Sequence, residues 1–67
     1  MAVNKLLGDK ERFLKIYANL PLGVRQEIIL VLADKGPITW NAAFIEVNAK
    51  TALSRVILQK LKKLEII

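Results

Sequence analysis

The sequence contains no cysteine and no histidine, and it has only three glycines and two prolines. Without cysteine no disulfide can form, and without either residue type the Cys/His zinc sites of small domains are excluded. The lack of histidine and of a glycine-rich phosphate loop removes most of the usual groups for acid–base or phosphoryl chemistry. Only six carboxylates are present, and they are scattered. We therefore expect a protein that is not an enzyme and that uses no metal and no cofactor.

Long hydrophobic runs are also absent. No stretch approaches the ~20 apolar residues that a membrane-spanning helix needs. The first residues, M-A-V-N-K-L-L-G-D-K-E, turn charged too soon for a signal peptide, so a cytoplasmic protein is expected. The chain has 67 residues, of which 54% are hydrophobic, and this predicts one small folded domain with a marginal core. The missing cysteine and histidine and the scarcity of glutamine favour a thermophilic source.

A basic segment occupies the end of the chain. The net charge is +5, and residues 49–64 contain five bases and no acid. The same residues carry apolar side chains spaced by three and four, which predicts a helix over about 49–64 with one core-facing side and one cationic side. The apolar positions are Leu53, Val56, Ile57, Leu61 and Leu64. A basic balance favours nucleic acid or another anionic surface as the partner, and a charged surface that serves solubility alone is the alternative.

The first half of the chain predicts two helices. Asp9 is expected to cap a helix from Lys10 to about Asn19, which ends before Leu20-Pro21 because a residue preceding proline is disfavoured in a helix. Residues 28–33 are apolar on nearly every side, so a central helix is expected over about 22–35, ended by Gly36-Pro37. A buried strand is the alternative for that run. The apolar face of the first helix comprises Phe13, Ile16, Tyr17 and Leu20.

The second half predicts two further helices. Ile38 is expected to be extended, Thr39 or Asn41 to cap a short helix that ends at about Val47, and Trp40 to fill the core. The basic helix follows it. The expected fold class is therefore all-α, a small bundle of about four helices with at most a minimal β-pair.

Three consecutive segments of this half carry a pattern. They read G-P-I-T at 36–39, A-A-F-I-E-V at 42–47 and L-S-R-V-I-L-Q-K-L-K-K-L-E-I-I at 53–67. This order resembles the winged helix–turn–helix family of DNA-binding regulators, in which a G-P-[ILM]-[TS] segment precedes a short helix and then a recognition helix. The resemblance covers about half of the chain. It implies one helix–turn–helix domain over 1–67, with an N-terminal helix in 1–20 and the helix–turn–helix core in 21–67.

The sequence departs from the family pattern at two places. The turn between the two helices usually carries a glycine, and V-N-A-K at 47–50 has none, so Asn48 is expected to take that position. The family also places a β-hairpin wing after the recognition helix. Ile66-Ile67 stands where its first strand would begin, with Ile38-Thr39 as the expected pairing partner. Either the domain is wingless or the sequence is a piece of a longer protein.

The resemblance implies double-stranded DNA binding and a role in transcription regulation. In such motifs the start of the recognition helix faces base edges and flanking cations meet phosphates. Arg55 would then read guanine and Gln59 adenine. The expected base-proximal residues are Lys50, Thr51, Ser54 and Arg55, and the expected backbone-facing residues are Gln59, Lys62 and Lys63.

A single small domain binds DNA weakly, so a homodimer is expected, with Phe13 and Tyr17 as contacts. The alternative is a protein-interaction module of helix–turn–helix shape, such as a small subunit of a nucleic-acid-processing complex with an acidic protein partner. The missing wing and the apolar end of the chain favour that alternative. A membrane-surface helix is disfavoured because the core needs the apolar stripe.

Overall fold

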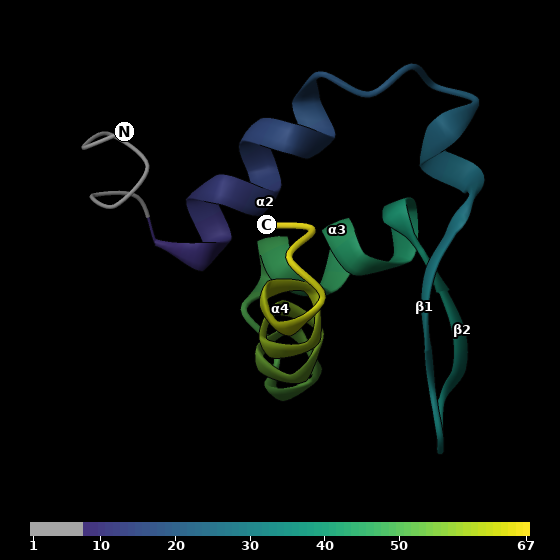
Figure 1. Ribbon diagram of the computed structural model, residues 1–67, viewed down its shortest axis with the longest axis vertical. Coiled ribbons are helices and arrows are strands. Elements are labelled where there is room, and N and C mark those ends of the chain that lie inside the picture. Colours follow the sequence, from purple (N-terminus) through teal and green to yellow (C-terminus); the bar gives the residue numbers. More distant parts are fainter. Residues whose placement is uncertain (1–7) are drawn as a thin grey trace.

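A computed structural model describes residues 8–67, which form three α-helices, one 3-10 turn and a two-stranded antiparallel sheet (Figure 1). In chain order the elements are α2 (Asp9–Ala18), η1 (Val24–Gln26), β1 (Ile28–Leu32), β2 (Gly36–Thr39), α3 (Trp40–Ala49) and α4 (Ala52–Lys63). The described part of the chain is a small mixed α/β fold, so the expected all-α bundle of about four helices is wrong. The part of the expected N-terminal segment that precedes Gly8 lies outside the described residues.

The expected helix over 22–35 is the main error, because this segment forms η1 and β1. The 3-10 turn is closed by the Val24 N–H, which donates to the Pro21 carbonyl at 3.0 Å, and by the Glu27 N–H, which donates to the Val24 carbonyl at 2.9 Å. This turn bounds the following apolar run on its N-terminal side, as expected for a strand. The apolar run that follows is rich in β-branched side chains, which favour extended backbone.

Gly36 opens the second strand of the hairpin instead of ending a helix. Its φ of +80° is one that glycine adopts without steric cost. Pro37 follows in β2, where it pairs with Val31. A two-stranded sheet has only edge strands, which tolerate proline. The Gly-Pro dipeptide therefore marks a chain reversal here, although both of its residues are equally typical of a helix end.

The hairpin places its apolar side chains unequally. The register pairs Leu30 with Ile38 and Leu32 with Gly36, and it shifts between Ile28 and Leu30. Leu30 is 8% exposed whereas Ile28 is 58% exposed, although two residues of a regular strand would face the same side. The irregularity accounts for this difference, since a bulge re-aims the side chains on one side of it. Within residues 8–67 the sheet consists of β1 and β2, and Ile66-Ile67 belong to neither strand, so their expected pairing with Ile38-Thr39 is wrong.

The three helices and both strands share one core, and α3 is central to it. This helix contacts α2, η1, β2 and α4. Trp40 packs against the core as expected, with its ring centroid 5.7 Å from that of Phe13. Tyr17 on α2 stacks on Phe44 of α3, with ring centroids 4.3 Å apart. The fully or nearly fully buried apolar residues are Phe13, Leu30, Leu32, Ile38, Ala43, Val47, Ile57 and Leu61.

The three helices exist close to where they are expected, and their ends differ in detail. Gly8, rather than Asp9, is the N-cap of α2, and it makes no side-chain capping bond. Thr39 caps α3 as expected, because its hydroxyl oxygen accepts from the Ala42 N–H at 3.0 Å. α4 begins at Ala52, three residues later than expected, and its N-cap is Thr51. Among residues 8–67 no helix has the length and apolar character needed to cross a membrane.

Candidate nucleic-acid interface

Two residues, Lys50 and Thr51, join α3 to α4. Lys50 has φ 57° and ψ 42°, the left-handed conformation. Its N–H donates to the Val47 carbonyl at 3.2 Å, and the Thr51 N–H donates to the Glu46 carbonyl at 3.3 Å. These two bonds form a Schellman motif, which satisfies the last carbonyls of α3 and reverses the chain. Asn48 lies within α3, so the expectation that it would take the left-handed position is wrong.

Thr51 and Ser54 use their hydroxyls at this turn. The Thr51 hydroxyl accepts from the Ser54 N–H at 3.1 Å and donates to Oε1 of Glu46. Ser54 is only 5% exposed, and its hydroxyl donates to the Thr51 carbonyl. Both hydroxyls were expected to lie near bases. In the structure they fix the start of α4 against the end of α3, so they position the helix.

The remaining expected contact residues lie on the outer side of α4. Ile57 and Leu61 are 0% exposed and bind α4 to the core. On the opposite side, Arg55, Gln59 and Lys62 are exposed and follow one another at spacings of four and three, so they form one row along the helix. A second exposed row contains Lys60 and Lys63. We call these five residues, Arg55, Gln59, Lys60, Lys62 and Lys63, the basic face.

Lys62 has a carboxylate neighbour that the sequence did not indicate. Its Nζ lies 3.9 Å from Oδ1 of Asp9, at the start of α2. The Lys62 side chain is 62% exposed, and an ion pair this long and this exposed contributes little to stability. The pair therefore leaves Lys62 accessible to a polyanion, although Asp9 partly offsets its charge.

The position of the lysines within α4 has a structural reason of its own. Lys60, Lys62 and Lys63 lie in the last turn, where cations interact favourably with the helix dipole. Only Arg55 and Lys50 carry positive charge near the start of the helix. The two ends of α4 therefore differ. Arg55 is the cation in its first turns, and three lysines lie together in its last turn.

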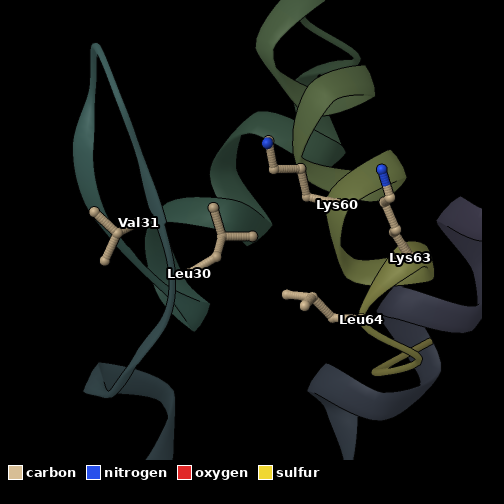
Figure 2. A pocket seen from close by; sticks show the side chains of 5 residues that line it. All are labelled: Leu30, Val31, Lys60, Lys63 and Leu64. Carbon is tan, nitrogen blue, oxygen red and sulfur yellow. The ribbon is translucent and has the colours of Figure 1, made fainter.

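Lys60 was not among the expected site residues, and the structure places it beside a pocket of about 290 Å³. The pocket lies between the hairpin and the last turn of α4, and the Lys60 side chain projects towards the hairpin (Figure 2). The spacing of three between Lys60 and Lys63 was the available signal, since it places both on one side of a helix. The residues that line the pocket are Leu30, Val31, Lys60, Lys63 and Leu64.

Of the two expected dimer contacts, Phe13 is buried and Tyr17 is half-buried. Phe13 is 0% exposed. Tyr17 is half-buried, its ring stacks on Phe44, and its hydroxyl donates to Oδ1 of Asn41 at 2.6 Å. The Arg25 guanidinium covers the same ring, 4.4 Å from its centroid. Phe13 therefore offers no surface to a second copy, and a homodimer with Tyr17 as a contact remains a prediction.

Residues 8–67 contain no cluster of three or more acidic side chains that could hold a metal ion. Comparison with protein families, with curated proteins and with solved structures found no match for the chain.

Proposed function

We propose that this protein binds double-stranded DNA through α4, as a helix–turn–helix protein that regulates transcription. The observation that supports this most is the division of α4 into two sides. Ile57 and Leu61 fix one side in the core, and the other side exposes the basic face. The major groove of DNA admits one α-helix, and an exposed cationic helix on a small rigid domain fits it.

The roles within the proposed interface follow from position along α4. Arg55 lies in the first turns, where side chains of a recognition helix meet base edges, and its guanidinium can contact guanine through two hydrogen bonds. Gln59 is one turn further and has the amide that pairs with adenine. Lys50 at the turn and Lys62 and Lys63 at the far end are assigned to phosphates. Thr51 and Ser54 hold the helix in place.

The proposed assembly is a homodimer. One domain of this size offers few phosphate contacts, and two copies related by a twofold axis would double them. Their α4 helices should then be separated by about one turn of DNA, roughly 34 Å. Sedimentation in the presence of duplex tests this step, since a single copy on each duplex at saturation would contradict it.

The test of DNA binding is a titration of labelled random-sequence duplex at several salt concentrations. Each phosphate contact contributes about one released ion to the slope of log K against log salt. Replacing Lys62 with alanine should reduce that slope by roughly one. Lys15, an exposed lysine on α2, provides the matched control, because Lys15→Ala removes the same charge outside the basic face. Absence of binding even at low salt would contradict the proposal, because the electrostatic contribution does not depend on sequence.

A further inference from the structure

The pocket beside Lys60 combines an apolar interior with a cationic rim. Leu30 from the hairpin and Leu64 from the end of α4 point toward one another, with Lys60 and Lys63 on the α4 side, whereas the Val31 side chain points away from α4 (Figure 2). No carboxylate is among the lining residues. Leu64 is 59% exposed. An exposed apolar side chain beside an apolar pocket, with charged side chains around it, is typical of a binding surface.

The backbone of β1 adds a second property to the same place. Leu30 and Val31 belong to β1, and within residues 8–67 this strand pairs only with β2. Half of the peptide groups of an edge strand point away from its partner and are free to pair with an added strand. Figure 1 shows β1 on the side of the hairpin nearer to α4. Apolar side chains, a cationic rim and an unpaired strand edge therefore coincide.

We propose that this groove binds a short acidic segment of a partner protein, in extended conformation, in which apolar residues alternate with Asp or Glu. The segment would add to the edge of β1, as in other complexes that use strand addition. Its apolar side chains would contact Leu30 and Leu64, and its carboxylates would pair with Lys60 and Lys63. The volume of about 290 Å³ suits a few side chains.

Charge complementarity selects an acidic partner over a second copy of the chain. Both charged residues of the rim are lysines, and a second copy would bring a net charge of +5 against them. Like charges brought together in this way disfavour association. A segment with several carboxylates reverses the sign of this interaction. The site goes beyond the proposed DNA binding. It shares Lys63 with the proposed DNA interface, but its apolar residues and the edge of β1 have no part in that interface, and Arg55, Gln59 and Lys62 lie outside the pocket.

The probe for the test is a fluorescein-labelled peptide of alternating aspartate and leucine, measured by fluorescence anisotropy. Saturable binding is expected, and it should weaken between about 0.05 M and about 0.5 M salt because the charges are exposed. A peptide of alternating aspartate and serine keeps the charge and loses the apolar contacts, so it should bind at least about tenfold more weakly. A peptide of alternating lysine and leucine should not bind. Equal affinity for the serine peptide would overturn the proposal.

Two variants and one control locate the site. K60E/K63E should lower the affinity for the aspartate–leucine peptide by about tenfold or more, because both pairing cations become anions. Leu64→Ser should lower it as well, and thermal melting establishes that each variant is folded. Arg55→Glu changes charge on the other row and should leave peptide affinity within about twofold. Unchanged affinity in K60E/K63E would contradict the proposal, as would competition by a second copy of the chain at rising protein concentration.

Discussion

The Thr51 hydroxyl donates a hydrogen bond to Oε1 of Glu46, and this contact ties the start of α4 to the last turn of α3. The same hydroxyl accepts from the Ser54 N–H. One side chain thus caps α4 and joins it to the preceding helix. The orientation of the basic face depends on this joint, because only two residues separate the helices.

Replacing Thr51 with alanine should therefore lower the free energy of unfolding by about 1 kcal/mol, since a lost N-cap of this kind typically costs that much. Thr51→Ser keeps the hydroxyl and should recover most of the loss. Urea denaturation followed by circular dichroism measures both. A DNA affinity that falls in Thr51→Ala by more than the loss of folded protein would instead indicate a direct contact between Thr51 and DNA.

Ile57 provides the sharpest test of the core beneath α4. It is 0% exposed, and Ile57→Ala should cost about 2–5 kcal/mol because it removes buried methyl groups and leaves a cavity. A loss of that size can unfold a domain this small at room temperature. Ile45 on α3 is 63% exposed, so the same substitution there is the matched control and should change stability by about 0.5 kcal/mol or less. Similar losses at the two positions would mean that α4 does not pack as described.

The contact between α2 and α3 gives another prediction. The Tyr17 hydroxyl donates to Asn41 Oδ1 across 24 residues of sequence. Tyr17→Phe keeps the stack on Phe44 and should cost about 1 kcal/mol, a typical net value for one hydrogen bond. Asn41→Ala should cost a similar amount, and the double variant should cost less than the sum. Additive losses would show that the two groups do not interact.

Lys50 is a site where a substitution should stabilise the protein. A residue with a Cβ in the left-handed conformation is strained by roughly 1–2 kcal/mol, and glycine avoids that strain at some cost in chain entropy. Lys50→Gly should therefore raise the free energy of unfolding by about 0.5–1 kcal/mol. Asn48→Gly is the control, because Asn48 is helical and glycine there should destabilise by up to about 1 kcal/mol. If Asn48→Gly stabilised the protein and Lys50→Gly destabilised it, the left-handed residue at the end of α3 would be Asn48 and not Lys50.

Sequence patterns predict the helices well because each has local signals. The apolar spacing of α4, the Thr39 cap and the break at Leu20-Pro21 depend on residues a few positions apart. The Schellman turn at Lys50 was missed because lysine rarely adopts that conformation. At the site, helical spacing predicts the exposure of Arg55 and Lys62, but it cannot show that Ser54 is buried.

The hairpin was missed because its signals are ambiguous. Ile28–Leu32 has the length and the β-branched content of a strand, but an apolar run this short is also compatible with a buried helix. A Gly-Pro dipeptide such as Gly36-Pro37 is compatible both with the end of a helix and with the start of a strand. The deciding contacts join β1 to β2 and both strands to the core, and they depend on tertiary packing. The pocket beside Lys60 could not be predicted for the same reason, because it exists only where the hairpin lies opposite α4.

The most direct test of the proposed function is a titration of isotopically labelled protein with duplex DNA, followed through backbone amide signals. We predict that the largest shifts fall on residues 50–63, with Arg55 and Gln59 among them. Signals from α2 should move little, except at Asp9, which lies beside Lys62. Shifts confined to the hairpin and α2, or no shifts at low salt, would contradict DNA binding through α4.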